Sequence, residues 1–369
     1  MAEDEILLPG ATDLHVHLRD WEESYKETVS SGTLAALSGG VTTVVEMPNT
    51  KPPIDNPEAL SKRLELLESD SYVDCAVHVG LPRELQILSA MRREGAIGVK
   101  LYPKDFPRLR EAFRAAHDQS LKLAVHAEDP EALVQDPVGP RAEENGVKEV
   151  CKVASRVGNV RFCHVSLASS VSAIAELKSH TNGVSFEVTP HHALLSCGPD
   201  YRQLPPSLNV RPPLRRECDR IAMFETLRNG IADFYATDHA PHTASEKESQ
   251  NAPPGLRSLK FAYPLLLTEL QDVAMACRLY CERPAAYLGE TKGKIEPGMI
   301  ADLVVFRTRT RPDGQEPEAN SNEFDIVETG PFVGRRLGYK VEQVYKGGVL
   351  SYSSETGPLA KRGRREHSA

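Results

Sequence analysis

Short apolar segments of strand type recur along the chain and alternate with stretches of helical period. Eight segments are predicted to be strands: Ala11–His17, Val41–Met47, Tyr72–Val79, Ala96–Leu101, Leu121–Ala127, Val160–Val165, Val184–Thr189 and Ala232–Asp238. The spacing predicts helices over Thr28–Ser38, Pro57–Glu68, Arg83–Arg93, Phe106–Asp118, Glu143–Val157, Ser169–Ser179 and Arg216–Asn229, and an eighth helical region from Leu259 onward. This alternation implies parallel pairing, because parallel neighbours need a crossover connection.

Eight such units in about 280 residues predict a (β/α)8 TIM-type barrel of the α/β class. A doubly wound sheet would usually carry a glycine-rich loop after its first strand, where this chain has His-Val-His. We expect the barrel to span 10–289, and residues 1–9 plus 290–355 to form a small appended β subdomain with a hairpin at Gly347-Gly348. Pro312–Asn322 is expected to be a loop, and 356–369 a disordered basic tail.

Composition limits the partners and the compartment. The chain has 369 residues, with 44 Lys and Arg against 52 Asp and Glu, and this balance argues against nucleic acid as a partner. No run of eighteen apolar residues occurs, so no membrane span is expected. The first five residues are acidic, unlike a secretory signal. Seven cysteines without CxxC spacing indicate reduced thiols in a cytoplasmic protein.

The first predicted strand carries His15 and His17, which point to the same face because side chains two apart in a strand do so. Two imidazoles held in this way can chelate one divalent ion. The alternative is that they are two polar residues on a half-exposed strand.

The other predicted strands supply more side chains of ligand type at or near their ends, and active sites of such barrels form at the carboxyl ends of the strands. These candidates are Lys100, His126, His164, Glu187 and Asp238, with Arg19, Asn49 and His242 in the adjoining loops. Alone, His126 or His164 would more often be a hydrogen-bonded core histidine, and Asp238 could be a helix cap. Together with His15 and His17, they predict a site for zinc or a similar divalent ion.

Lys100 is the exception, because an ammonium group does not bind a cation. Reaction of its amine with carbon dioxide would give a carbamate, which could bridge two metals as a carboxylate does. Burial and nearby cations favour that reaction, since both lower the pKa of a lysine. Alternatively, Lys100 lies unmodified along the barrel rim.

An ordered series of motifs resembles that of the dihydroorotases, cyclic amidohydrolases of the amidohydrolase superfamily. The motifs span Pro9–Arg19, Met47–Pro53, Val99–Pro103, Val125–Asp129, Cys163–Ser166 and Ala236–Thr243. The resemblance implies two Zn²⁺ ions held by His15, His17, carbamylated Lys100, His126, His164 and Asp238. Glu187 matches a position that holds a further zinc in some relatives.

Dihydroorotases interconvert N-carbamoyl-L-aspartate and dihydroorotate in pyrimidine biosynthesis. The resemblance implies attack by a hydroxide that bridges the metals, with Asp238 as the general acid and base. It also implies a substrate-binding set of Arg19, Asn49 and His242 for the carboxylate, Arg211 nearby, and the backbone around Pro254 and Gly255 for the ring.

Three departures affect the loops. The family usually has a Pro-Gly turn where this chain has Asp20–Glu23, and Phe-x-Gly-x-Glu where it has Leu256–Lys260. The loop at Lys104–Arg108 lacks the threonines of many relatives. Two other activities stay open: another cyclic amidohydrolase (allantoinase, hydantoinase or dihydropyrimidinase), or an inactive scaffold. A homodimer, or a complex with another pyrimidine-pathway enzyme, is an expectation from the family alone.

Overall fold

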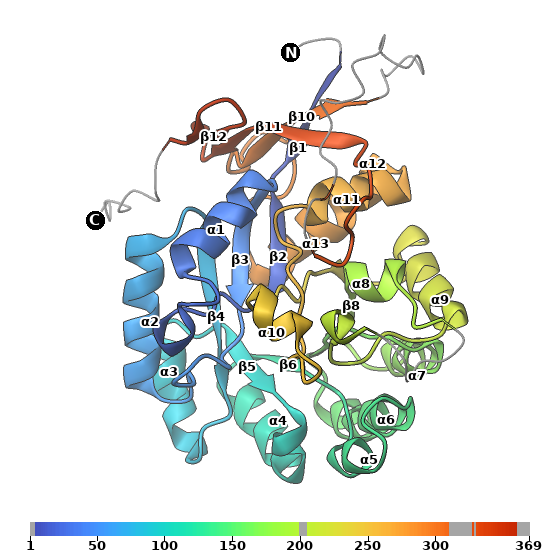
Figure 1. The fold of residues 1–369 in the computed structure, drawn as a ribbon. Coiled ribbons are helices and arrows are strands. Elements are labelled where there is room, and N and C mark those ends of the chain that lie inside the picture. Colours follow the sequence, from blue (N-terminus) through green and yellow to red (C-terminus); the bar gives the residue numbers. More distant parts are fainter. Residues whose placement is uncertain (1–3, 199–204, 310–326, 328–329, 360–369) are drawn as a thin grey trace.

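The computed structural model describes residues 4–198, 205–309, 327 and 330–359. Its main body is a parallel sheet of eight strands, in the order β2 to β9, surrounded by helices (Figure 1). The strands are β2 (Ala11–Val16), β3 (Val41–Glu46), β4 (Asp74–Gly80), β5 (Gly98–Leu101), β6 (Lys122–Val125), β7 (Val160–Phe162), β8 (Val184–Val188) and β9 (Phe234–Tyr235). A parallel bridge between Val16 and His239 closes the sheet, and the backbone N–H of His17 donates to the His239 carbonyl at 2.8 Å. The predicted barrel is therefore confirmed.

All eight predicted strands are present, but several predicted ends run past the last paired residue. His126, His164 and Asp238 follow β6, β7 and β9 instead of lying within them. His164 and Asp238 have φ angles of 37° and 48°, which no extended strand can accommodate. These side chains therefore lie in the loops at the mouth of the barrel.

The helices that alternate with the strands are α1 (Val29–Ser38), α2 (Pro57–Asp70), α3 (Leu88–Glu94), α4 (Leu109–Asp118), α5 (Pro130–Gln135), α6 (Arg141–Val157), α7 (Ala168–Lys178), α8 (Pro190–Leu194) and α9 (Glu217–Arg228). After β9 come α10 (Ala244–Glu248), α11 (Ala262–Leu270), α12 (Val273–Cys277), the π-helical turn η5 (Arg278–Glu282) and α13 (Arg283–Leu288). The 3₁₀ turns are η1 (Trp21–Glu23), η2 (Leu85–Ile87), η3 (Pro103–Arg108) and η4 (Pro206–Leu208).

The predicted start of α2 is correct, and a capping residue defines it. Pro57 is the first residue of α2, and the Asn56 side chain accepts a hydrogen bond from the Ala59 N–H at 3.0 Å. Ser169 was the wrong start for α7, which begins at Ala168 without a side-chain cap. The predicted helix from Phe106 begins instead as η3, where Pro107 has no N–H group to donate.

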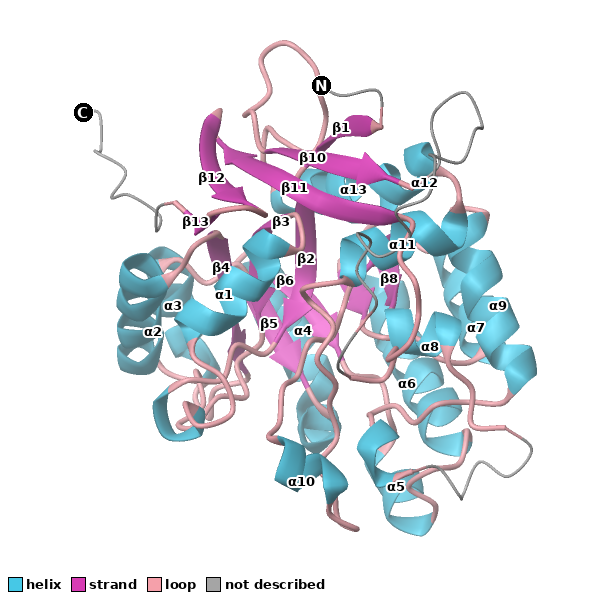
Figure 2. Cartoon of the chain, turned by 45° about the horizontal axis from the view of Figure 1, so that its top comes forward, coloured by secondary structure: helices cyan, strands magenta, loops and turns pink. Residues whose placement is uncertain are grey.

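A second, antiparallel sheet lies beside the start of β2, away from the carboxyl ends of the barrel strands (Figure 2). Its strands, in spatial order, are β1 (Glu5–Pro9), β10 (Leu303–Thr308), β11 (Tyr339–Lys346), β12 (Val349–Ser353) and β13 (Gly357–Pro358). The predicted hairpin at Gly347-Gly348 joins β11 to β12. Pro312–Asn322 and the basic run at 361–365 lie outside the described residues.

The largest apolar core joins the barrel strands to the helices around them, and a separate cluster contains Leu14, Val45 and Phe234 of β2, β3 and β9. Helix α1 contacts the small sheet. Within the part of the chain that is described, no helix combines the length and the apolar character needed to cross a bilayer. The candidate site residues at the carboxyl ends of the strands are thus supported by one packed barrel.

Candidate active site

A cavity of about 400 Å³ opens at the carboxyl ends of the strands. It is lined by His15, His17, Arg19, Glu23, Lys26, Asn49, Lys51, Lys100, Tyr102, His126, His164, Arg211, Asp238, Ala240, His242, Pro253, Pro254 and Gly255. Every predicted site residue except Glu187 is in this set. The side chains are polar and ionisable to a degree unusual for a protein interior.

Two histidines and an aspartate converge at the floor of the cavity. The Nε2 atoms of His15 and His17 lie 3.2 and 3.0 Å from Asp238 Oδ1. Glu187 contacts His15 Nδ1, and Asn49 Oδ1 lies 2.6 Å from His17 Nδ1. These acceptors hold each ring proton on Nδ1, so both Nε2 atoms direct lone pairs at a carboxylate oxygen. Such a group of electron donors fits a shared cation.

A second group adjoins the first. The ring of His164 lies 4.5 Å from that of His126 and 5.3 Å from that of His15, measured between centroids. Lys100 Nζ and His164 Nδ1 are buried, and neither has a hydrogen-bond partner among the described residues. Because an unpaired buried polar atom is costly, these two atoms also fit a bound group.

The protonation states agree with ligand roles. Burial, reinforced by the charge of Lys100, lowers the pKa of His15 well below its ordinary value. The pKa of His164 is lowered mainly by burial, so both rings are neutral, the form that binds metals.

Glu187 lies behind this floor, on β8, and does not line the cavity. One of its oxygens contacts His15 Nδ1 and accepts from the His164 backbone N–H at 3.2 Å. The other is paired with the buried guanidinium of Arg161. Ligand atoms of His15, Cys163 and Glu187 lie within 4.8 Å of one another, but both Glu187 oxygens already have partners.

The part of the cavity around Arg19 is cationic. Arg19 Nε donates to the Pro241 carbonyl at 3.1 Å, and Nη2 lies 3.2 Å from His242 Nε2. His242 Nε2 also lies 3.0 Å from the Pro254 carbonyl, and only a protonated nitrogen can donate to it. His242 therefore does not accept from Arg19, whose terminal N–H groups stay available for an anion. Asn49 also lines the cavity, and it orients His17.

The remaining predicted binding residues form the wall. Arg211 lines the cavity and contacts the Pro137 carbonyl. The Gly255 N–H donates to the Asn209 carbonyl at 3.0 Å, at a φ of 137°. A Cβ at Gly255 would collide with the Ala240 carbonyl oxygen, so only glycine fits there.

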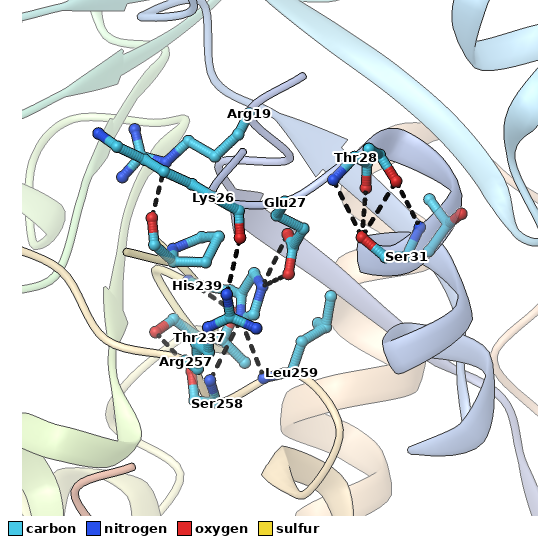
Figure 3. A network of polar contacts seen from close by, with 12 residues as sticks. Arg19, Lys26, Glu27, Thr28, Ser31, Thr237, His239, Arg257, Ser258 and Leu259 are labelled. Atoms are coloured by element: carbon cyan, nitrogen blue, oxygen red, sulfur yellow. Dashed lines mark hydrogen bonds and ion pairs between the residues drawn. The ribbon is translucent and has the colours of Figure 1, made fainter. Parts of the chain in front are cut away.

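A polar network behind the cavity joins three of its loops (Figure 3). His239, the residue after Asp238, lies with Nε2 3.1 Å from both carboxylate oxygens of Glu27. Its Nδ1 accepts from the backbone N–H groups of Ser258 and Leu259, at 3.1 and 3.3 Å. Because Nδ1 accepts, the proton is on Nε2 and is donated to Glu27. The loop after β9 is thereby fixed to the loop after β2 and to the segment before α11.

The cavity also contains residues that were not predicted. Tyr102 is two residues beyond Lys100 and supplies the single hydroxyl among the lining side chains; its oxygen is buried without a hydrogen-bond partner in the described chain. The same two-residue parity that placed the histidines could have indicated it. Glu23, Lys26 and Lys51 come from loops, for which parity gives no direction.

A (β/α)8 barrel with a histidine cluster suited to metal at its mouth is compatible with a metal-dependent hydrolase. Residues 6–350 match the model of the Amidohydrolase family, and the chain belongs to this family. Proteins named dihydroorotase are similar over much of the chain. The one from Pyrobaculum aerophilum is 36% identical, over 76% of this chain and 73% of its own. That from Geobacillus thermodenitrificans is 32% identical, over 94% and 87%.

Solved structures with low sequence identity share the fold. An L-hydantoinase (dihydropyrimidinase) from Arthrobacter aurescens superposes with a TM-score of 0.85 at 23% identity, over 97% of this chain and 87% of its own. A dihydroorotase from Saccharomyces cerevisiae gives a TM-score of 0.72 at 19% identity, over 92% and 98%. These likenesses support the barrel, and the choice of substrate depends on the cavity.

Proposed function

We propose that this chain is a dihydroorotase, which cyclises N-carbamoyl-L-aspartate to (S)-dihydroorotate and also catalyses the reverse reaction. The observation that carries the proposal is the pairing, in one cavity, of a metal-type cluster with a cationic end built on Arg19. A ring amide at the cluster and a carboxylate at the cationic end are the two features of this substrate. The relatives named dihydroorotase support the same assignment.

We propose two divalent ions, with zinc favoured by the donor set. His15, His17 and Asp238 would hold one, and His126 and His164 the other. Lys100 would serve both once its amine is carbamylated, which would give its unpaired Nζ atom a role. Divalent zinc supplies Lewis acidity, which polarises a carbonyl oxygen and lowers the pKa of water from 15.7 to about 7.

Asp238 is placed to hold and move the proton. Its Oδ1 lies against both imidazoles at the cavity floor, 3.2 and 3.0 Å from the Nε2 atoms of His15 and His17. In ring opening it would accept the proton of the attacking water and deliver it to the departing ring nitrogen. In cyclisation the same aspartate would take the proton from the ureido nitrogen and deliver it to the carboxyl oxygen that leaves as water.

Arg19 would orient the substrate by binding its carboxylate with the N–H groups that no described residue accepts. His242 and Asn49 line the same cavity and would complete the carboxylate site. Arg211, Pro254 and Gly255 would hold the ring. Since Nε of Arg19 is already bound to Pro241, the guanidinium is oriented before the substrate arrives.

A third ion at Glu187 has weaker support. Arg161 already supplies the positive charge that balances the Glu187 carboxylate. The pKa of Arg161 is raised because the attraction of Glu187 outweighs the effect of burial. We therefore propose two ions per chain, with Glu187 acting on His15 from behind.

A neutral-ring amidohydrolase is the competing enzyme, and Arg19 distinguishes the two. Arg19→Met should reduce kcat/KM for dihydroorotate by roughly 10²-fold, because a charge-assisted contact and its geometry are both lost. Hydrolysis of dihydrouracil, which lacks the carboxylate, should change little. Equal losses for both rings would favour the competing activity.

The direct test is cyclisation of N-carbamoyl-L-aspartate, followed by the absorbance of dihydroorotate. We expect activity in protein supplied with zinc and bicarbonate, and its loss after chelation. Anomalous scattering beside Lys100, with density for a carbamate, would test the metal pair. Activity absent from fully metallated protein would contradict the assignment and favour an inactive scaffold.

A further inference from the structure

The turn after β2 places a carboxylate among the cations at the anion-binding end of the cavity. Glu23 lines the cavity and is only 3% exposed. Its Oε1 accepts from Lys26 Nζ at 2.7 Å, and Lys51 Nζ lies 3.5 Å away. Its Oε2 lies 3.6 Å from Arg19 Nη1 and has no hydrogen-bond partner in the part of the chain that is described.

This turn is rigidly built. Asp20 accepts from the Trp21 N–H at 2.7 Å and from the Val29 N–H at 2.8 Å. The guanidinium of Arg63 stacks 5.0 Å from the Trp21 ring centroid and donates to the Arg19 carbonyl at 3.0 Å. The backbone is therefore held on both sides of the turn, and the carboxylate cannot easily leave Arg19.

Glu23 is ionised in this setting. Burial alone would raise its pKa, but the hydrogen bond from Lys26 and the charges of Arg19 and Lys51 outweigh burial and lower it. Three cations thus surround one carboxylate, and that carboxylate faces the same guanidinium edge that the substrate would use.

We propose that Glu23 is a specificity-determining residue that opposes the substrate carboxylate at Arg19 and keeps the affinity of the cavity for small carboxylates low. The inference rests on the proposed function, in which Arg19 binds that carboxylate. Both substrate and product of a reversible cyclisation carry this group, so both must be released. Without Glu23, Arg19 and Lys51 would lose the carboxylate that they face and Lys26 would keep only Glu246, at 3.6 Å, so the three cations would hold a small dianion too tightly.

The two consecutive glutamates provide a matched pair of variants. Glu23→Gln removes the charge and keeps the shape, whereas Glu22→Gln makes the same change on an exposed neighbour. Malonate is the probe, with its dissociation constant measured by calorimetry on metal-loaded protein. We expect Glu23→Gln to bind malonate about three- to tenfold more tightly, and Glu22→Gln to bind like the wild type.

The tighter malonate binding of Glu23→Gln must depend on Arg19. Adding Arg19→Gln to Glu23→Gln should abolish the tighter binding. In cyclisation, Glu23→Gln should lower KM by a similar factor and leave kcat within about twofold. Binding of uncharged hydantoin should not change.

Unchanged or weaker malonate binding by Glu23→Gln would overturn the proposal, since it would make Glu23 a structural support for Arg19 and Lys26. Malonate binding requires no turnover, so this test stands even if the protein does not cyclise N-carbamoyl-L-aspartate. If the amide variant does not fold, Glu23→Ala, compared with Glu22→Ala, gives the same test with the same expected outcomes.

Discussion

The position of one proton decides whether an imidazole can be a ligand. Asn49 and Glu187 each accept from the Nδ1 atom of one histidine, His17 and His15 respectively, and so release Nε2 for the cavity. Glu187 thus acts on the metal cluster through His15. At the scale of the residue, chemistry is set by partners that come from other strands.

Asp238→Asn tests the proton-transfer role. The amide keeps the shape of the side chain but cannot accept a proton, so kcat should fall about 10²–10⁴-fold in both directions. Bound metal, measured by elemental analysis, shows whether the cluster survives. Asp118→Asn, on an exposed position at the end of α4, is the control and should be silent. An Asp238→Asn enzyme that retains most of its kcat would assign the proton to another group.

His242 makes stability depend on pH. Burial, followed by the charge of Arg19, lowers its pKa from 6.5 to about 4. A depressed histidine pKa stabilises the fold above pH 6.5, and this contribution is lost as the pH falls from 6.5 through 4. The free energy of unfolding of the wild type should therefore fall relative to His242→Gln across that window, by on the order of 1–3 kcal/mol. Parallel pH profiles for the two proteins in urea titrations would contradict this expectation.

The sequence placed the cavity residues well because strand parity and strand ends act locally. It missed Glu23 because the path of the turn depends on distant partners, such as Arg63 stacking on Trp21. It gave no sign that Arg161 pairs with Glu187, because that contact joins two strands and only the fold shows it.

At the scale of elements, hydrophobic period predicted all eight strands and most helices of the barrel. It overran the ends of β6, β7 and β9, where the chain leaves the sheet at residues with functional side chains. The hydrophobic period also could not separate the 3₁₀ turn η3 from the α-helix α4 that follows it. Over a single turn, both kinds of helix bury residues at similar spacing. The ends of elements are decided by tertiary contacts.

The loop at Gly255 offers a test at this scale. Gly255→Ala would force a Cβ against the Ala240 carbonyl at a φ of 137°, so the wall of the cavity must shift. We expect KM to rise at least severalfold, and the fold to lose about 1–3 kcal/mol of stability. Gly334→Ala is the control, because Gly334 also has a positive φ but an added Cβ there would meet nothing within 4 Å. Equal effects of the two variants on KM would show that the close approach is unimportant.

At the scale of the whole molecule, barrel closure and the active site depend on the same contacts. Asp13 at the core of β2 accepts from the Thr237 N–H at 3.2 Å and from the Tyr280 hydroxyl at 2.7 Å. The first and last strands meet there, directly beneath His15 and Asp238. Binding of a group between these two side chains should therefore stabilise the entire barrel.

Lys100→Met tests how much of the free energy of unfolding comes from the protein alone and how much from bound metal. Lys100 is 1% exposed and its amine has no described hydrogen-bond partner, so methionine should leave the metal-free protein equally stable or more stable by about 1–3 kcal/mol. For the wild type, zinc and bicarbonate should raise the free energy of unfolding by about 4 kcal/mol at a thousandfold excess over Kd. The variant should lose most of that increment, whereas Lys152→Met, on an exposed helix face, should keep it. Urea titrations with and without zinc measure all three proteins, and equal stabilisation of Lys100→Met by zinc would place the metals away from this amine.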